Sequence, residues 1–252
     1  MRMKVVGLAW CLTLVLAGCA TSPPIPSFEI QRGDRVGVLV DIGDGPVHTH
    51  IGTTAFNNFE KKYPYQWRLD TTVAEVLGHS LAKSGLTVVD LEKEGVGYSD
   101  VTPLVVGDGE KWKVAPGKEN TVQELANRKG LKAVAVIKEA RVMTALECAG
   151  GPCSERYANA SGLYTRSFLG VTRYHAVAAF ALNVYVLNPP ADISRADPLR
   201  TMMRMPAIAL GNYPAPRNFE QITEAEFLPV REAILKFSEQ MAAEIAKALN
   251  PK

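Results

Sequence analysis

The sequence predicts an α/β fold: a single domain with a mixed β-sheet and two or three flanking helices, and an α+β arrangement as the alternative. Three observations support this prediction. Short apolar segments of strand length alternate with amphipathic segments of helical period. The order strand–helix–strand, followed by helix–strand, is typical of parallel strands joined by crossover helices. The 252 residues are 47% hydrophobic, which is enough for a sizeable core.

The first half of the chain supplies two predicted strands, a helix and a further strand. The apolar run 35–41 is the first strand, and a Gly-Asp-Gly-Pro turn separates it from the alternating segment 47–53. These two segments are interpreted as a hairpin. A Thr-x-x-Glu capping box and a later glycine predict a helix over 72–85. Residues 86–91 then form the next strand.

The second half begins with another Thr-x-x-Glu box, which predicts a helix over 121–130 before a strand at 132–138. The segment 173–187 is interpreted as one long central strand, because β-branched and aromatic residues recur near its end and Asn-Pro-Pro follows. Residues 199–210 are expected to return antiparallel to it. Apolar residues at helical spacing predict a last helix over 228–249, in which the proline falls in the first turn.

The N-terminus has the parts of a bacterial secretion signal. A short positively charged start precedes an apolar run of about a dozen residues. As a helix this run covers roughly 18 Å, which is too short for a hydrocarbon core of about 30 Å. Leu16-Ala17-Gly18-Cys19 follows, an apolar residue and two small residues before a cysteine. This tetrapeptide resembles the lipobox of bacterial lipoprotein precursors.

The lipobox resemblance implies that residues 1–18 are a signal peptide, that cleavage precedes Cys19, and that this cysteine carries lipid. Two or three acyl chains hold a protein stably on a membrane. The next residue is Ala20 rather than aspartate, which by resemblance to enterobacterial sorting rules favours the outer membrane over the inner one. Residues 19–33 are expected to be an extended, disordered Pro/Ser-rich tether, and residues 34–252 a periplasmic domain. The alternative is an ordinary secretory signal.

The mature chain is expected to carry no net formal charge. Residues 1–18 contain two of the 28 basic residues and no acidic residue, so 26 basic and 26 acidic residues remain. A nucleic-acid partner is therefore not expected, because it would require a concentrated basic face. No cofactor is expected either, since phosphate-loop and dinucleotide signatures are missing from the sequence. A Gly-x-Ser-x-Gly nucleophile elbow is also missing.

Cys148 and Cys153 remain after Cys11 leaves with the signal and Cys19 is lipidated. The envelope outside the inner membrane is oxidising, and the Ala-Gly-Gly-Pro between the two residues allows the chain to fold back. A disulfide is therefore expected. A metal site is an alternative, but it would need two more ligands, and the closest is His175. A redox-active pair is the other alternative, although such pairs usually have Cys-x-x-Cys spacing.

His48 and His50 are the best candidates for metal ligands. Residues two apart on a strand point the same way, so both imidazoles could reach one ion. Asp41 and Asp44 lie close in sequence, and Asp41 falls at a strand end, where α/β proteins tend to bind ligands. Three protein ligands are usual at a catalytic zinc, so this set would suit a metal-dependent hydrolase. The alternative is a hairpin with a polar outer face and aspartates in its turn.

Tyr63, Tyr65 and Trp67 are candidates for partner binding, because tyrosine and tryptophan are enriched at the centres of protein interfaces. The alternative is a loop that fills the core. Residues 161–169 have a similar mix of aromatic and polar side chains, with the same two interpretations. The apolar stripe of the last helix is more typical of packing on its own sheet.

The lipid anchor, the tether and the lack of a catalytic motif favour a non-enzymatic lipoprotein of the cell envelope. Its periplasmic domain would bind envelope proteins or its own copies. The element order and the lipobox resemble periplasmic α/β lipoproteins that assist envelope machines, such as the curli-secretion and penicillin-binding-protein-activator groups. This resemblance implies no site, because no functional motif matches residue by residue. Two other hypotheses are the hydrolase using His48 and His50, and a secretion-pore component that inserts residues 161–187.

Overall fold

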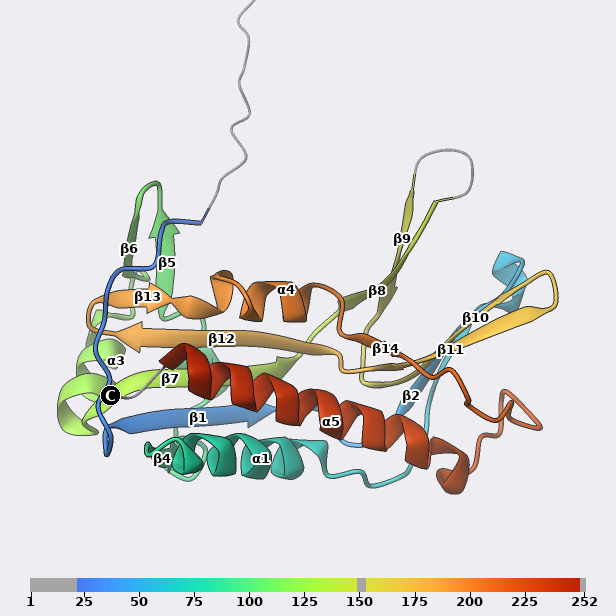
Figure 1. Ribbon diagram of the computed structural model, residues 1–252, viewed down its shortest axis with the longest axis horizontal. Helices are drawn as coiled ribbons and strands as arrows, with labels where there is room; N and C mark the ends of the chain where they lie inside the picture. The colour runs from blue at the N-terminus through green and yellow to red at the C-terminus, as the bar shows by residue number, and fades with distance from the viewer. Residues whose placement is uncertain (1–21, 149–152, 250–252) are drawn as a thin grey trace, which may run out of the picture.

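Two five-stranded β-sheets form the framework of the protein, and the computed structural model describes it over residues 22–148 and 153–249 (Figure 1). The first sheet has the strand order β13-β12-β7-β1-β4 and the second has the order β14-β11-β10-β2-β3. Each sheet contains parallel and antiparallel pairs. The predicted single-domain α/β fold with mixed sheets is therefore confirmed.

The first sheet has β7 at its centre, between β12 and β1. Its members are β1 (Arg35–Asp41), β4 (Thr87–Asp90), β7 (Leu131–Glu139), β12 (Phe180–Leu187) and β13 (Pro190–Asp192). β1 pairs in parallel with β4 and β7, whereas β12 pairs antiparallel with β7 and with β13. Continuous apolar runs in β1 and β7 fit this position, because a central parallel strand is covered on both faces.

Two long helices, α1 (Leu69–Lys83) and α5 (Glu224–Leu249), lie against one another on one face of the first sheet. Their buried residues recur at helical spacing and join the largest hydrophobic cluster. Smaller elements cover the opposite face and form a second cluster. These elements are α2 (Tyr98–Val101), β5 (Val105–Asp108), β6 (Lys111–Val114), α3 (Glu119–Gln123) and η2 (Glu124–Arg128).

The second sheet extends to one end of the molecule. Its members are β2 (Val47–Ile51), β3 (Phe59–Lys62), β10 (Gly162–Phe168), β11 (Val171–Val177) and β14 (Ala207–Ala209). β2 and β10 are parallel, and the other neighbours are antiparallel. A separate hairpin is formed by β8 and β9, and the remaining short elements follow here: β8 (Val142–Glu147), β9 (Ser154–Ala158), η1 (Ala55–Asn57), η3 (Ile193–Arg195) and α4 (Leu199–Arg204).

Two strand predictions are wrong, and a third is right only for the short strand at its end. The segments at 35–41 and 47–53 do not form a hairpin, because β1 and β2 belong to different sheets. The segment 173–187 is not one strand, because β11 ends at Val177 and β12 begins at Phe180 in the other sheet. Both halves are apolar since each is buried, and the pattern does not report that the chain changes sheet between them. Residues 199–210 contain α4 before the short β14 that does pair antiparallel with β11.

The long helices begin earlier than predicted. α1 begins at Leu69, and the Thr72 hydroxyl donates to the Arg68 carbonyl within the helix instead of capping it. α5 begins at Glu224, before the predicted start at residue 228. Thr223 and Glu226 form a reciprocal capping box: the Thr223 amide donates to Glu226 Oε2 over 2.7 Å, and the Glu226 amide donates to Thr223 Oγ1 over 3.3 Å.

The expectation of a disordered tether is wrong for residues 22–33, which pack along the domain. Ile30 is buried in the main cluster, and Ile25 and Phe28 pack against it. The Trp112 indole Nε1 donates to the Pro24 carbonyl over 3.2 Å. The apolar side chains in this Pro-rich segment explain its placement, because burying them offsets the entropy lost on ordering. The lipobox and Cys19 lie outside the described residues.

Candidate functional site

His48 and His50 meet at one hydroxyl. Both lie on the same face of β2, as the alternation predicts, and the neighbouring β10 places Thr165 beside them. Thr165 Oγ1 lies 2.7 Å from His48 Nε2 and 2.7 Å from His50 Nδ1, and His48 Nδ1 lies 3.0 Å from the Phe219 carbonyl oxygen. One proton arrangement satisfies all three contacts: His50 donates to Thr165, Thr165 donates to His48, and His48 donates to Phe219.

Both histidines are buried, which contradicts the interpretation of this segment as a hairpin with a polar outer face. The rings of Phe59 and Phe219 pack against them, with ring centroids between 5.0 and 6.0 Å apart. Burial lowers the pKa of His48 from 6.5 to about 4, and burial also lowers the pKa of His50. Both imidazoles are therefore neutral at pH 7, and neutral rings fit the hydrogen bonds described above.

The structure does not bring the two candidate aspartates to the histidines. Asp41 ends β1 in the other sheet, and its Oδ2 lies 3.9 Å from Lys138 Nζ. Asp44 lies in the turn after β1 and its Oδ1 accepts from the Arg68 amide over 2.8 Å. Within residues 22–148 and 153–249, no three His, Cys, Asp or Glu side chains gather in a way that would hold a metal ion.

The aromatic segment is part of the core. Tyr63 and Trp67 are buried, and Tyr65 is half-buried. All three rings pack around Phe227 of α5, with ring centroids 5.0, 6.0 and 5.7 Å from it in the order Tyr63, Tyr65 and Trp67. The Tyr65 hydroxyl donates to the Ile222 carbonyl over 3.0 Å. The partner-binding interpretation is therefore wrong for Tyr63 and Trp67, because a buried ring cannot contact a partner.

Cys148 and Cys153 form the expected disulfide, with their sulfur atoms 2.00 Å apart. The bond joins the end of β8 to the start of β9, so it ties the two strands together where the hairpin projects from the domain (Figure 1). Residues 149–152 lie outside the described residues.

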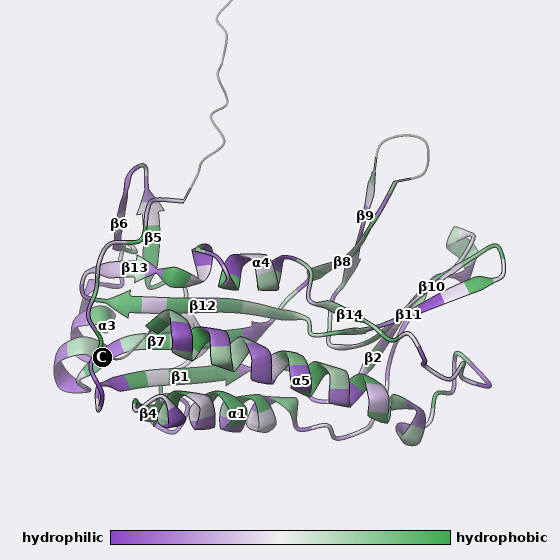
Figure 2. Cartoon of the chain, viewed as in Figure 1, coloured by the Kyte–Doolittle hydropathy of each residue, from purple (hydrophilic) through white to green (hydrophobic). Residues whose placement is uncertain are grey.

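Four apolar side chains are exposed around one hollow, and we call them the hairpin surface. They are Leu146 of β8, with 53% of its surface exposed, and Phe168, Leu169 and Val171 at the tip of the β10–β11 hairpin, with 53, 76 and 64% exposed. They line a cavity of about 690 Å³ together with Glu147, Arg166 and Arg173. Figure 2 shows the apolar residues at this tip. Exposed apolar side chains that gather in this way mark binding surfaces.

The sequence contains a local signal for the hairpin surface. Phe168-Leu169-Gly170-Val171 places large apolar residues on both sides of a glycine turn, where a hairpin normally has polar residues. The composition of residues 161–169 makes them a candidate for partner binding. No sequence pattern places Leu146 beside them. The β8–β9 hairpin leaves the plane of the sheets, and only that geometry adds Leu146 to the surface.

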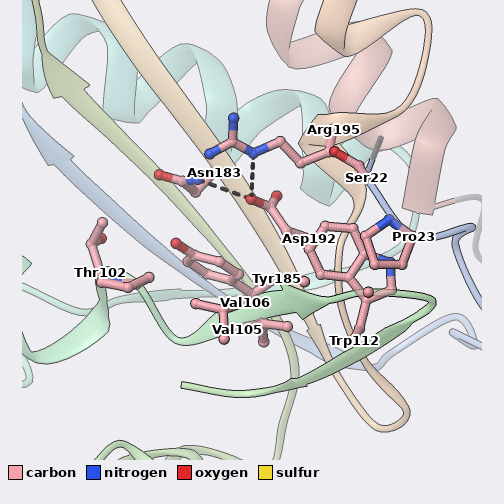
Figure 3. Close-up of a pocket in the computed structure, with 13 residues that line it drawn as sticks. Ser22, Pro23, Thr102, Val105, Val106, Trp112, Asn183, Tyr185, Asp192 and Arg195 are labelled. Atoms are coloured by element: carbon pink, nitrogen blue, oxygen red, sulfur yellow. Dashed lines mark hydrogen bonds and ion pairs between the residues drawn. The ribbon is translucent and has the colours of Figure 1, made fainter. Parts of the chain in front are cut away.

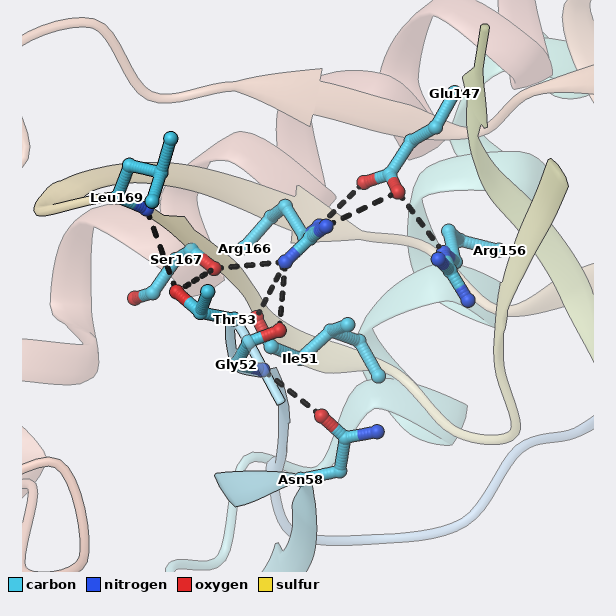
Figure 4. Close-up of polar contacts among 9 residues, drawn as sticks. All are labelled: Ile51, Gly52, Thr53, Asn58, Glu147, Arg156, Arg166, Ser167 and Leu169. Atoms are coloured by element: carbon cyan, nitrogen blue, oxygen red, sulfur yellow. Dashed lines mark hydrogen bonds and ion pairs between the residues drawn. The ribbon is translucent and has the colours of Figure 1, made fainter. Parts of the chain in front are cut away.

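Glu147 links three strands beneath the hairpin surface (Figure 4). Its carboxylate accepts from Arg166 Nε over 2.5 Å and from Arg156 Nε over 3.1 Å. The hydrogen bond from Arg166 is the main reason that the pKa of Glu147 lies below its usual value. Because Glu147 is on β8, Arg156 on β9 and Arg166 on β10, this network fixes the angle between the two projecting hairpins.

Further contacts hold the tip of the β10–β11 hairpin in place. Arg166 Nη1 donates to the Gly52 and Ser167 carbonyl oxygens, each over 2.7 Å. The Leu169 amide donates to Thr53 Oγ1 over 3.3 Å (Figure 4). Leu169 has a φ of +47°, a conformation that is uncommon for a residue other than glycine. The surrounding contacts therefore keep a leucine exposed at some cost in backbone energy, which is typical of functional positions.

The charges around the hairpin surface are unbalanced. Two arginines, Arg166 and Arg173, line the hollow with one carboxylate, that of Glu147. Arg173 is exposed and forms no ion pair with a residue that the structure describes. An apolar centre with surplus positive charge at its rim suits a partner that offers apolar side chains flanked by carboxylates.

Comparison with known proteins finds no matching family model, no matching curated protein and no matching solved structure. In the part of the chain that the structure describes, no helix combines the length and the apolar character needed to cross a membrane.

Proposed function

We propose that this chain is a lipid-anchored lipoprotein of the cell envelope that binds an acidic envelope protein through its hairpin surface and catalyses no reaction. The exposed apolar side chains of that surface are the observation that carries the proposal. The lipobox supports anchoring through Cys19, and Ala20 supports the periplasmic face of the outer membrane. The Cys148–Cys153 disulfide is consistent with an oxidising compartment.

The shape and charge of the hairpin surface favour another protein over a bilayer or a second copy of this chain. A flat bilayer would not fill a hollow of about 690 Å³ between two hairpins. In a two-fold symmetric dimer through this surface, the same patch would meet itself. Arg166 and Arg173 of one copy would then face the same arginines of the other, which costs free energy.

Leu169→Glu is expected to weaken partner binding by about tenfold or more, because it places a carboxylate in the apolar centre of the interface. The measurement is affinity capture of the full-length tagged protein from chemically crosslinked envelopes, with quantification of each crosslinked protein. Leu228→Glu is the matched control. Leu228 is also exposed, at 50%, but lies on α5 outside the hairpin surface, so capture should be unchanged.

Capture that also weakens as salt is raised would support the charged rim. Equal capture by Leu169→Glu and the wild type would contradict the proposal. Sedimentation of the purified protein tests the self-association alternative, because dimers that Leu169→Glu dissociates would show that the surface binds a second copy.

Cys19→Ser is expected to abolish lipid attachment, because the thiol that accepts the diacylglyceryl group is missing. The measurement is incorporation of labelled fatty acid, together with fractionation of the envelope. We expect no label and loss of the protein from the membrane fraction. Cys11→Ser, in the same predicted signal peptide, is the control and should leave labelling unchanged. Membrane retention of labelled Cys19→Ser would exclude this anchor.

A further inference from the structure

A second cavity lies at the opposite end of the domain from the hairpin surface, beside the N-terminal segment, and we call it the N-terminal pocket (Figure 3). Its volume is about 570 Å³. Residues of β12, β13 and η3 form one wall, and the β5–β6 hairpin forms another. Ser22 and Pro23 border it. The function proposed for the hairpin surface does not involve the polar side chains of this pocket.

Asp192 is the buried centre of the polar wall. Its Oδ1 accepts from the Ser194 amide, the Ser194 hydroxyl and the Val184 amide over 3.1, 2.6 and 3.3 Å. Its Oδ2 accepts from Asn183 Nδ2 over 3.0 Å and from Arg195 Nε over 3.4 Å. With five donors around it, this carboxylate needs no further partner, and it positions the side chains that surround it.

Arg195 presents unused hydrogen-bond donors to the N-terminal pocket. Only its Nε donates to a described residue, and its two terminal amino groups extend away from Asp192 (Figure 3). The side chain is anchored at one end by Asp192 and is still 59% exposed. A guanidinium with two parallel free N–H groups matches the oxygen atoms of a phosphate or carboxylate group.

Tyr185 supplies a second donor from a fully buried position. Its residue surface is 0% exposed and it lines the pocket, with its hydroxyl beside the Thr102 hydroxyl and the Leu104 backbone but well aligned for a hydrogen bond with neither. Burial, with the Asp192 carboxylate nearby, raises the pKa of Tyr185, so the hydroxyl keeps its proton at pH 7. Because its contacts within the protein are poorly aligned, this hydroxyl can still donate a better hydrogen bond to a ligand. The Thr102 hydroxyl beside it lines the same pocket and is also buried.

The opposite wall is apolar and firmly placed. Trp112, Val105 and Val106 line it together with Pro23. Pro23 packs so closely on β5 that a Cβ atom at Gly107 would lie 2.7 Å from Pro23 Cδ. A ligand therefore meets hydrogen-bond donors on one side and carbon on the other. This combination suits a molecule with an anionic group and a short carbon skeleton.

We propose that the N-terminal pocket binds a phosphate ester, with Arg195 pairing to the phosphate oxygens and Tyr185 donating a hydrogen bond to it. The Asn183 carboxamide oxygen, which accepts no hydrogen bond from a described residue, is available to a hydroxyl group of the ester. Phosphate esters of this kind occur as free metabolites and as the headgroups of glycerophospholipids.

The lipid headgroup is the favoured source of the phosphate ester. This assignment rests on the proposed anchoring through Cys19. Three residue steps separate Cys19 from Ser22, and a fully extended chain covers at most about 10 Å in that length. Because Ser22 borders the pocket and Pro23 is packed in place, a lipid on Cys19 would hold the pocket close to the headgroup layer.

The test is isothermal titration calorimetry on the full-length protein in a non-ionic detergent. Its two probes are glycerol 3-phosphate and short-chain dihexanoyl phosphatidylglycerol, with dihexanoylglycerol as the phosphate-free control. We expect saturable binding of the phosphatidylglycerol and none of the phosphate-free control. Equal binding of glycerol 3-phosphate would retain the phosphate-ester proposal and assign a soluble source. Both results are independent of whether Cys19 carries lipid.

Tyr185→Phe is expected to weaken phosphate-ester binding about tenfold with little effect on the stability of the unliganded protein, because the contacts of this hydroxyl with Thr102 and Leu104 are poorly aligned. Arg195→Gln should weaken binding at least as much, and Asp192 keeps its four other donors in that variant. Tyr164→Phe is the matched control. Tyr164 is also 0% exposed, and its hydroxyl makes a similarly poorly aligned contact with Thr144, but it does not line this pocket.

Binding that is unchanged in both Tyr185→Phe and Arg195→Gln would overturn the proposal. So would a wild-type protein that binds neither phosphate probe, or one that binds dihexanoylglycerol as tightly as the phosphate-containing lipid.

Discussion

Replacing Gly162 with alanine is expected to destabilise the protein by about 4 kcal/mol or more, or to prevent folding. Gly162 begins β10 with a φ of +150°, and a Cβ atom there would lie 2.0 Å from the Val47 carbonyl oxygen. Gly162 and Val47 are paired residues of the parallel strands β10 and β2. The added methyl group therefore cannot be accommodated unless the two strands separate, and this pairing also brings Thr165 to His48 and His50.

Urea unfolding of the full-length protein measures this effect, and Gly95→Ala is the control. Gly95 also has a positive φ, +74°, but no atom lies within 4 Å of the Cβ position. Its substitution should cost only about 1 kcal/mol, the backbone term alone. Equal losses of stability in the two variants would contradict the close approach of β2 and β10 at Gly162.

Stability is expected to fall by about 3 kcal/mol as the pH falls from 6.5 to about 4, because His48 is buried in its neutral form. Above pH 6.5 His48 is neutral in both the folded and the unfolded chain, so it has no effect on the pH dependence. Below that pH the unfolded chain binds a proton that the folded chain does not bind until about pH 4. The loss therefore accumulates between these two values, and His50 adds to it in the same direction.

Urea unfolding above pH 6.5 and near pH 4 measures this loss, and His48→Gln is expected to remove most of the His48 contribution. The amide can still donate and accept hydrogen bonds at this site, but it does not titrate. His79→Gln, at an exposed position on α1, is the control and should keep the wild-type pH dependence. A His48→Gln protein that loses as much stability as the wild type would show that other groups cause the acid sensitivity.

Strands and helices with a clear local pattern could be predicted, and their boundaries and partners could not. The runs at 35–41 and 131–139 are strands because they are continuously apolar, as central parallel strands require. The start of α5 lies before the predicted one: Pro229 predicts the first turn, whereas the capping box of Thr223 and Glu226 begins the helix. The apolar pattern of 173–187 predicts one strand, but the segment forms two strands in different sheets. Burial in either sheet gives the same pattern.

At the candidate sites too, the sequence predicts local features but not which distant residues surround them. The spacing of His48 and His50 predicted that they share a face, but not that Thr165, Phe59 and Phe219 would enclose them. The aromatic residues Tyr63 and Trp67 had the composition of a binding surface, yet Phe227 of α5 covers them. A hydrophobic side chain has the same identity in a core and at an interface, and only its neighbours distinguish the two.

The sequence by itself determined the α/β class, the helical and strand periods, and the Cys148–Cys153 disulfide, because each depends on residues close together in the chain. Only the tertiary structure decided which sheet each strand joins, which rings are buried, and that Arg195 and Tyr185 face one pocket. The physical reason is distance along the chain. His48 and Thr165 are 117 positions apart, and a local pattern carries no information about such a contact.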